Sequence, residues 1–427
     1  MSRRWQNASR WARWCVLAGT ALMLISGATL VTVDRALARY EDAVHQADLF
    51  GDQSTGGTDP VPSAAPTRPA DIKGPLNILL AGIDPRHDDP NWIPRADSVL
   101  VMHIPAGLDR GYLFSLPRDL LVAIPPFPKS GYGGNASDKL AHAMFFGAQH
   151  PGQRRADYAQ GFELLAATVS RYTGIERFDA GAIIDFSGFE DVVDALGGVD
   201  MVVDQRVASI HREPDGDPRD RGAGSTGYVG PQMVYEPGRR HFKGWQALDY
   251  ARQRYIPGGD YARQRHQQQL VRAMISKAFS GDLLTDPLRM DRVLRTVGGS
   301  LTFSGRGHGI VDWAFALQDL RPANVVMIRL TGGGVGRWVE DKSDDDKDDD
   351  KPKDDGDGDG DAEPDDPQDD GKKDDKKDDE KKDEKPKLKY QYLGEQLHPA
   401  SRQFLASVAA GSVENFMAFH PEMVNKS

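Results

Sequence analysis

Three short apolar runs decide the fold: NILLAGI (Asn77–Ile83), SVLVMHI (Ser98–Ile104) and GYLFSL (Gly111–Leu116). Each run is shorter than a typical helix and is bounded by Gly, Pro or Asp, so each predicts a buried β-strand. Three later runs have the same character: AGAIIDF (Ala180–Phe186), GVDMVVD (Gly198–Asp204) and NVVMIRL (Asn324–Leu330).

Helical patterns lie between these runs. Gly161–Thr173 and Arg263–Ser280 carry apolar residues three and four positions apart, and Ser187 is placed to cap a helix over Gly188–Leu196. The alternation of strands with helices predicts an α/β fold in which helices cover a sheet.

The first 74 residues predict a membrane anchor. Residues 1–13 carry four arginines and no acid, and residues 14–33 form an uncharged run that is long enough to span a bilayer as a helix. Residues 34–74 predict a stalk and a linker rich in Gly, Ser, Thr and Pro. By the positive-inside bias, we expect a single-pass cell-membrane protein with a cytoplasmic N-terminus and an extracellular domain. A cleaved signal peptide is the alternative, because Ala36–Ala38 has the small-x-small pattern of a cleavage site.

An acidic segment, residues 340–387, carries 25 Asp and Glu against 12 Lys. It lacks large apolar residues, so it predicts a disordered insertion between a catalytic domain over residues 75–339 and a C-terminal segment over residues 388–427. Tyr390–His420 regains an apolar spacing that predicts a closing helical segment. Asp355–Asp366 resembles the start of a calcium loop, but no helices flank it, and a solvated polyanion is the alternative.

The rest of the chain is nearly neutral, with 41 Lys and Arg against 39 Asp and Glu. This balance argues against a general nucleic-acid binder. The single cysteine, Cys15, excludes an internal disulfide and a Cys-rich metal site. A local cluster of arginines therefore stands out.

That cluster lies in YARQRYIPGGDYARQRHQQQ, residues 250–269. Arg252 and Arg254 are two positions apart, so they point the same way only in an extended segment. We therefore expect both on an extended exit from a helix over Gly244–Tyr250. A solvated, salt-bridged arginine face is the alternative interpretation.

The second half of this run predicts another helix. Asp260 is placed to cap it, Arg263 lies in its first turn, and Gln267 follows one turn later. A cation in the first turn opposes the helix dipole unless an anion is bound nearby. Because helix N-termini bind phosphate, both halves of the run can converge on one anion.

Charged residues also lie at the ends of the first three strands: Asp84 and Arg86 follow the first, Arg95 and Asp97 precede the second, and Arg118 and Asp119 follow the third. Ligand sites in open α/β sheets lie at strand ends. Asp84 and Asp97 would suit a magnesium ion, which is held by one or two carboxylates plus phosphate oxygens. Alternatively, these acids are ion-pair partners of Arg86 and Arg95.

Together these stretches resemble the LytR-CpsA-Psr (LCP) family of cell-wall glycopolymer transferases. The resemblance runs in family order from Leu76 to about Ser280 and continues more weakly to His420. It is carried by NILLAGIDPR, PRADSVLVMHI, SLPRDLLVAIP, DKLAHAM, the run Gly161–Asp200, PGRRHFKGWQALDYARQR and GDYARQRHQQQ.

The resemblance implies a three-layer α/β/α sandwich around a twisted mixed sheet, with an apolar pocket for a prenyl chain. We expect apolar positions of Arg263–Ser280 and Gly161–Thr173 to line that pocket, or else to belong to the ordinary core. The implied activity is an extracytoplasmic phosphotransferase that moves a glycopolymer, as a glycosyl phosphate, from a polyprenyl-pyrophosphate carrier to peptidoglycan. Polyprenyl phosphate is the second product.

By position, the resemblance implies that Asp84 and Asp97 bind Mg²⁺ or Mn²⁺. The implied pyrophosphate-binding set is Arg95, Arg118, Lys139, Arg252, Arg254, Arg263 and Gln267. The implied catalytic residues are Arg118, Arg252, Arg254 and Asp119. Asp119 and Asp84 are both candidates for a general base, and neither is preferred.

The chain departs from the family pattern at two places. The family often has Arg where this chain has His266, which would weaken phosphate binding above weakly acidic pH. It often has Asn-His where this chain has Ala141-His142. We expect His142 and His266 to be structural or substrate-contacting and not zinc ligands.

Two other functions stay open. A hydrolase of the lipid pyrophosphate would use the same cations, and a non-enzymatic binder of anionic wall polymer would use them as a docking surface. Paired acids argue against plain polyanion binding. The expected partners are the lipid-linked glycan, peptidoglycan and the membrane, with no nucleic acid.

Overall fold

The structure, a computed structural model, describes residues 45–51, 72–85, 89, 92–152, 155–223, 226–278, five residues between 292 and 298, 301–340 and 388–425. The predicted membrane helix over residues 14–33 and the acidic segment beyond Glu340 lie outside these residues. In the described part of the chain, no helix is both long enough and apolar enough to cross a membrane. The chain divides into two compact units, residues 1–333 with 394–427, and residues 334–393.

A seven-stranded mixed sheet forms the centre of the first unit, in the order β1-β12-β7-β2-β3-β4-β13. Its strands are β1 (His45–Gln46), β2 (Leu76–Ile83), β3 (Ala96–Ile104), β4 (Gly111–Leu116), β7 (Ala180–Asp185), β12 (Leu301–Ser304) and β13 (Val325–Ile328). The pairs β1–β12, β2–β7 and β4–β13 are parallel, and the other neighbours are antiparallel. The predicted mixed α/β fold is therefore confirmed.

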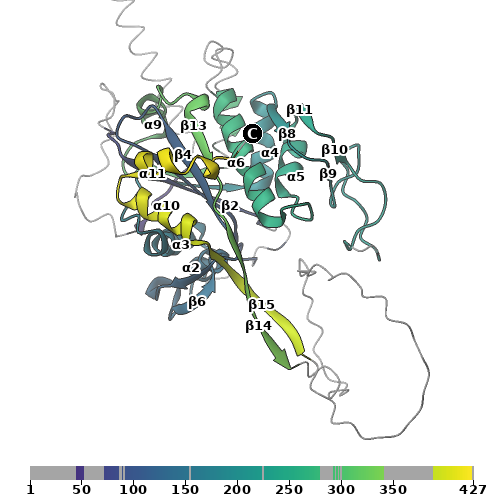
Figure 1. Ribbon diagram of the computed structural model, residues 1–427, viewed down its shortest axis with the longest axis horizontal. Coiled ribbons are helices and arrows are strands. Elements are labelled where there is room, and N and C mark those ends of the chain that lie inside the picture. The colour runs from purple at the N-terminus through teal and green to yellow at the C-terminus, as the bar shows by residue number, and fades with distance from the viewer. Residues whose placement is uncertain are drawn as a thin grey trace, which may run out of the picture. The chain divides into compact units, whose positions relative to one another are not determined.

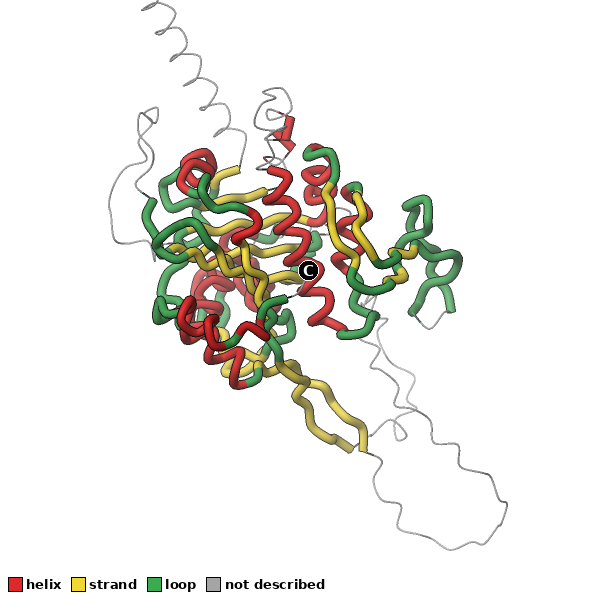
Figure 2. Tube along the Cα trace, turned by 45° about the horizontal axis from the view of Figure 1, so that its top comes forward, coloured by secondary structure: helices red, strands yellow, loops and turns green. Residues whose placement is uncertain are grey.

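Helices cover both faces of this sheet (Figures 1 and 2). The helices of the first unit whose bounds the structure describes are α2 (Ala141–Ala148), α3 (Tyr158–Thr173), α4 (Phe186–Ala195), α5 (Gly244–Arg252), α6 (Gly259–Ala278), α9 (Ile310–Ala316), α10 (Pro399–Ala409) and α11 (Val413–Phe419), together with the 3₁₀ turns η3 (Pro128–Ser130), η4 (Pro322–Asn324) and η5 (Pro421–Met423). Strand alternation assigns the layers. Leu79, Val99 and Phe114 pack in one core with α2, α3, α10 and α11, whereas Leu100 and Met102 pack in another with α6 and α9.

Short two-stranded sheets complete the first unit. They are β5 (Leu121–Ile124) with β6 (Asn135–Lys139), β8 (Val199–Val203) with β11 (Gly238–Phe242), and β9 (Val207–Ala208) with β10 (Val234–Tyr235). Val199, Met201 and Val203 face a separate small core with α4 and α5. The predicted strand over Gly198–Asp204 therefore exists, but it lies outside the main sheet.

The second unit contains most of a hairpin made by β14 (Gly332–Glu340) and β15 (Leu388–Leu397). The rings of Trp338 and Tyr390 meet edge to face with centroids 5.2 Å apart. A Cβ on Gly336 would lie 2.5 Å from the Tyr390 ring, so the ring can occupy this position only because residue 336 has no side chain.

Four boundaries differ from the sequence prediction. Helix α5 continues through Arg252, and extended backbone begins only at Gln253, because no helix breaker occurs before Pro257. Helix α6 begins at Gly259, so Asp260 lies inside its first turn. Helix α4 is capped by Asp185, which accepts from the Gly188 amide at 2.6 Å. The C-terminal segment opens with strand β15 before its helices.

Helices α2 and α3 approach closely at two glycines. A Cβ on Gly161 would lie 2.8 Å from the carbonyl oxygen of Met144 and 2.9 Å from the Cβ of Ala148. A Cβ on Gly147 would lie 2.7 Å from the Cβ of Leu164. The α2–α3 spacing therefore depends on the absence of side chains at these two positions.

We predict that Gly161→Ala lowers the free energy of unfolding by about 1–3 kcal/mol, because a backbone carbonyl and a helix must move to admit the methyl group. Gly133→Ala is the matched control, since nothing lies within 4 Å of the added Cβ. Thermal unfolding of the purified variants measures both changes. Equal melting temperatures for Gly161→Ala and the wild type would show that the helices do not need this contact distance.

Candidate functional site

The site begins where β2 ends and its antiparallel neighbour β3 begins. Gly82 pairs with Ser98 but Ile83 pairs with Ala96, so Asp97 is the extra residue of a β-bulge. Bulges re-aim side chains and are frequent beside active sites. Asp84 follows Ile83 directly on the other strand. The two predicted metal ligands thus lie on either side of the Ile83–Ala96 pair, Asp84 after β2 and Asp97 in the bulge of β3.

Arg118 joins this edge from the segment after β4. Its Nη1 lies 3.1 Å from Oδ1 of Asp97, and its Nε lies 3.6 Å from Oδ1 of Asp119. The Nζ of Lys139 lies 3.5 Å from Oδ2 of the same Asp119. Four of the predicted residues, Asp97, Arg118, Asp119 and Lys139, therefore form one chain of alternating charge. The buried Nε of Arg118 has no hydrogen-bond partner among the described residues.

Arg252 reaches the same edge from the end of α5. Its Nη2 donates to Oδ2 of Asp84 at 2.7 Å, and its Cζ lies 4.6 Å from the ring centroid of Phe186. The ring and the carboxylate fix the plane and direction of the guanidinium. Asp84 and Asp97 do pair with arginines, since Arg252 contacts Asp84 and Arg118 contacts Asp97. The alternative partner Arg86 lies outside the described residues.

Helix α6 supplies two more predicted residues. Gln267 accepts a hydrogen bond from Ser98 at 3.0 Å, and Arg263 pairs with Asp260 one turn earlier. Only 6% of Arg263 is exposed, and its Nε has no hydrogen-bond partner among the described residues. A nearly buried guanidinium with an unused donor suits an additional anionic ligand.

The remaining two predicted arginines have aromatic neighbours. The Cζ of Arg95 lies 5.7 Å from the ring centroid of Phe145, and the Cζ of Arg254 lies 5.4 Å from that of Tyr255. No recorded contact joins either of them directly to Arg118 or Arg252. The structure thus leaves their predicted role in pyrophosphate binding untested.

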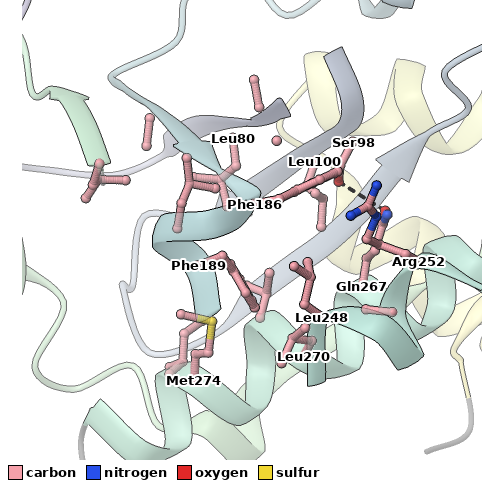
Figure 3. Close-up of a pocket in the computed structure, with 18 residues that line it drawn as sticks. Leu80, Ser98, Leu100, Phe186, Phe189, Leu248, Arg252, Gln267, Leu270 and Met274 are labelled. Atoms are coloured by element: carbon pink, nitrogen blue, oxygen red, sulfur yellow. Dashed lines mark hydrogen bonds between the residues drawn. The ribbon is translucent and has the colours of Figure 1, made fainter. Parts of the chain in front are cut away.

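An apolar cavity of about 250 Å³ begins beside Arg252 and Gln267 (Figure 3). Its walls come from β2, β3, β7, β12, α4, α5 and α6, and the α6 side is formed by Leu270, Val271, Met274 and Ile275. This volume lies just below the usual range of ligand pockets, roughly 300–1,000 Å³. The cavity would therefore hold part of a long hydrocarbon chain.

The apolar positions of α6 face this cavity as predicted, but those of α3 do not. Phe162, Leu165 and Val169 pack with α2 and α10 on the opposite face of the sheet. The expectation that Gly161–Thr173 lines the pocket is wrong. An apolar stripe shows that a helix covers a sheet, but not which face it covers.

A buried hydrogen-bond network holds the turn between Arg252 and Arg254. Asp249 accepts from Tyr235 at 2.7 Å, Ser209 at 2.8 Å and Gln253 at 2.8 Å. Burial, the largest influence, raises the pKa of Asp249, while the hydrogen bonds from Tyr235 and Ser209 oppose the rise. The role of Asp249 has no signal in the sequence, because a single Asp in a helical pattern is typical of a surface position.

His266 has a structural position. Its ring stacks on Tyr250 with centroids 4.2 Å apart, and its Nε2 lies 3.1 Å from Asp204. Burial lowers the pKa of His266 despite its carboxylate partner. Burial acts to raise the pKa of Asp204, but hydrogen bonds from His266 and Arg265 outweigh it and hold that pKa below its ordinary value. The contacts of His266 are thus with Tyr250 and Asp204, and the expected effect of this position on phosphate binding stays a prediction.

The C-terminal segment also reaches the site within the first unit. The amide of Glu395 donates to the carbonyl of Asp119 at 2.8 Å, and its carboxylate accepts from Tyr261 at 2.6 Å. Burial raises the pKa of Glu395, and the Tyr261 hydrogen bond opposes that rise. Residues more than 130 positions apart therefore brace Asp119 and the start of α6.

Arginine–carboxylate pairs at the end of an apolar cavity, on the edge of a mixed sheet, define a protein that can bind an amphiphilic anion. The chain belongs to the LytR-CpsA-Psr family, because the LytR_cpsA_psr family model matches residues 43–349.

Two similar proteins are TagU of Bacillus cereus and TagU of Bacillus mycoides, each named polyisoprenyl-teichoic acid–peptidoglycan teichoic acid transferase. The first is 26% identical over 265 residues, which cover 62% of this chain and 70% of TagU. The second is 28% identical over 280 residues, 63% of this chain and 74% of TagU. The probable cell wall biosynthesis protein LcpB of Corynebacterium glutamicum is 29% identical over 272 residues, 61% of this chain and 55% of LcpB.

Two solved structures are also similar. The B. subtilis TagV structure has 20% identity and a TM-score of 0.45, over 62% of this chain and 88% of that one. The structure of TagT bound to LI-WTA has 25% identity and a TM-score of 0.41, over 61% of this chain and 80% of that one.

We predict that Arg252→Ala weakens binding of a prenyl pyrophosphate by about 10- to 100-fold, since charge-assisted hydrogen bonds contribute roughly 1.5–3 kcal/mol. Arg252→Lys keeps the charge but loses the planar fork, so it restores binding only in part. Isothermal titration with farnesyl pyrophosphate measures both.

Arg265→Ala is the matched control, because Arg265 pairs with Asp204 at 2.6 Å and not with the acids of the site. This variant should bind as the wild type does. A solvated arginine face predicts the opposite pattern: Arg265→Ala would be as damaging as Arg252→Ala, and Lys would replace Arg252 without loss.

Proposed function

We propose that this protein is an extracytoplasmic phosphotransferase that attaches a glycopolymer from a polyprenyl-pyrophosphate carrier to peptidoglycan, releasing polyprenyl phosphate. The observation that carries the proposal is the junction at Arg252, where a cation paired with Asp84 adjoins an apolar cavity. A prenyl pyrophosphate has this same division into an apolar chain and an anionic head. The names of the TagU relatives support the glycopolymer and peptidoglycan as substrates.

In the proposed reaction, an acceptor sugar hydroxyl attacks the phosphorus next to the glycan. The bond from that phosphorus to the bridging oxygen breaks, and polyprenyl phosphate leaves with the electron pair. Arg118 and Arg252 would donate to phosphate oxygens and stabilise the charge on the leaving group. Because phosphoryl transfer needs little covalent chemistry from the protein, positioning and charge stabilisation supply most of the rate.

Magnesium fits the donor set at the β2–β3 edge. Asp84 and Asp97 offer two carboxylates from either side of the Ile83–Ala96 pair, and no group of three or more metal-binding side chains occurs among the residues that the structure describes. Mg²⁺ is typically held by one or two carboxylates together with substrate phosphates. Bound there, it would neutralise charge on the pyrophosphate oxygens; Mn²⁺ would serve in the same way.

The proposed location is the outer face of the cell membrane. Residues 14–33 supply an uncharged run of spanning length, with arginines before it and no acids. This arrangement supports a single-pass anchor with a cytoplasmic N-terminus. The catalytic domain would then act where peptidoglycan is assembled.

Product analysis tests the proposal. The full-length protein is incubated with a lipid-linked glycan, peptidoglycan fragments and Mg²⁺, and the phosphorus-containing products are separated by mass. We expect a phosphodiester between glycan and peptidoglycan together with polyprenyl phosphate. Free glycan phosphate without the phosphodiester would establish a hydrolase, and binding without any product would establish a polymer-binding protein.

We predict that Asp84→Asn and Asp97→Asn raise the Mg²⁺ concentration for half-maximal activity by about 10- to 100-fold, because each removes one anionic ligand. Titration of Mg²⁺ into chelator-treated enzyme measures the shift. Asp191→Asn, at an exposed position on α4, is the control and should leave the titration unchanged. Unshifted curves for both site variants would mean that these acids serve only as partners of the arginines.

A further inference from the structure

An Asp–His pair stands at the start of helix α2, beside the charged chain. The Nδ1 of His142 lies 2.7 Å from Oδ1 of Asp138. Asp138 is itself held in place, since it accepts from the amide of Lys139 at 2.7 Å and from the side chain of Asn135 at 3.2 Å. No hydrogen bond to Nε2 of His142 is recorded within the described residues. A carboxylate on Nδ1 favours the tautomer in which Nε2 carries the free lone pair.

The backbone ties this pair to the cations of the site. The amide of Ala141, the residue before His142, donates to the carbonyl oxygen of Arg118 at 2.9 Å. Lys139, the residue after Asp138, contacts Asp119. The imidazole is partly exposed, with 29% of its side chain accessible. A bound acceptor can therefore reach it.

An aromatic surface continues from His142 along α2. Phe145 and Phe146 lie three and four positions later, so they share its helix face. The ring of Phe146 stacks on Tyr132 with centroids 4.3 Å apart and meets His142 edge to face at 6.0 Å. Phe145 lies against Arg95. Partly exposed aromatic faces suit the apolar face of a sugar ring.

We propose that His142, oriented by Asp138, is the general base of the transfer, and that Phe145, Phe146 and Tyr132 bind the acceptor sugar. This inference rests on the proposed function. In the step, Nε2 takes the proton of the acceptor hydroxyl while its oxygen bonds to the phosphorus next to the glycan. The bond to the bridging oxygen breaks, polyprenyl phosphate leaves with the electron pair, and the imidazolium later releases its proton to water.

The geometry favours His142 over the two acids named as candidate bases. Asp84 accepts a short hydrogen bond from Arg252, and Asp119 lies between Arg118 and Lys139. Both acids are occupied with the cations that would bind the pyrophosphate. His142 is linked to those cations through the backbone of its neighbours Ala141 and Lys139, and its hydrogen bond to Asp138 uses only Nδ1. It can therefore accept a proton without releasing a cation.

The test compares full-length wild type with His142→Ala, using lipid-linked glycan, Mg²⁺ and peptidoglycan fragments. We expect His142→Ala to transfer about 10²- to 10⁴-fold more slowly, the usual contribution of a general base. Affinity for the lipid-linked donor should stay within about twofold, since no donor contact is removed, and added imidazole should restore part of the rate. Phe146→Leu should raise the acceptor KM by roughly two- to tenfold while the donor KM stays unchanged.

His150→Ala is the matched control, because His150 lies just beyond the same helix and its recorded hydrogen bond is to the carbonyl of Pro151. It should transfer at the wild-type rate. Wild-type transfer by His142→Ala would overturn the inference and leave the proposed function standing. The inference would also be overturned if His142→Ala lost donor affinity and transfer rate in parallel and added imidazole did not restore the rate. That result would indicate a structural role for His142. If the wild type makes only free glycan phosphate, the proposed function fails and the inference falls with it.

Discussion

The pairing of Arg252 with Asp84 is the interaction on which the arrangement of the site depends. The guanidinium of Arg252 keeps 38% of its side chain exposed, but where it borders the apolar cavity it loses part of its hydration, at a free-energy cost. Asp84 at 2.7 Å and the Phe186 ring at 4.6 Å offset that cost. The same requirement explains Asp97 beside Arg118 and Asp260 beside Arg263. These acids hold the arginine side chains in position when no phosphate is bound.

This pairing has a consequence for ligand binding. An arriving pyrophosphate competes with carboxylates for the arginines, so net affinity is smaller than a count of charge-assisted hydrogen bonds suggests. In the proposed reaction, Asp84 and Asp97 would hold a magnesium ion, and its charge would reduce this competition by leaving Arg252 and Arg118 available to the phosphate. Metal and lipid pyrophosphate would then bind cooperatively at the β2–β3 edge.

Much of the fold could be predicted from the sequence, because short apolar runs bounded by Gly, Pro or Asp favour buried strands and α6 carries a long helical stripe. Partners of isolated segments could not be predicted. The run that forms β8 looks like the central strands but pairs with β11, and only one of its faces is buried, because Asp200 and Val202 are exposed between buried residues. The stripe of α3 likewise gave no information about which side of the sheet it covers.

The site shows the same division. Spacing and strand ends identified Asp84, Asp97, Arg118 and Arg252, which the structure brings into contact in pairs. The side chains that hold them were not identifiable, because Phe186, Tyr235 and Asp249 carry no local signal of their role. Phe186 is one of many apolar residues until α4 turns its ring beneath Arg252.

The buried acid Asp249 fixes the segment that carries Arg252 and Arg254 at the end of α5, so this segment is not a free loop. One of its three hydrogen bonds comes from Gln253, and Gln253 in turn accepts from the amide of Ile210 at 3.1 Å. The backbone between Arg252 and Arg254 is thus fixed from its buried side, while Asp84 and the Phe186 ring orient the guanidinium of Arg252. A partly dry site needs this rigidity, since a guanidinium displaced by 1 Å loses the alignment that makes its hydrogen bonds strong. The burial that raises the pKa of Asp249 is therefore a cost of holding Arg252 at the end of the cavity.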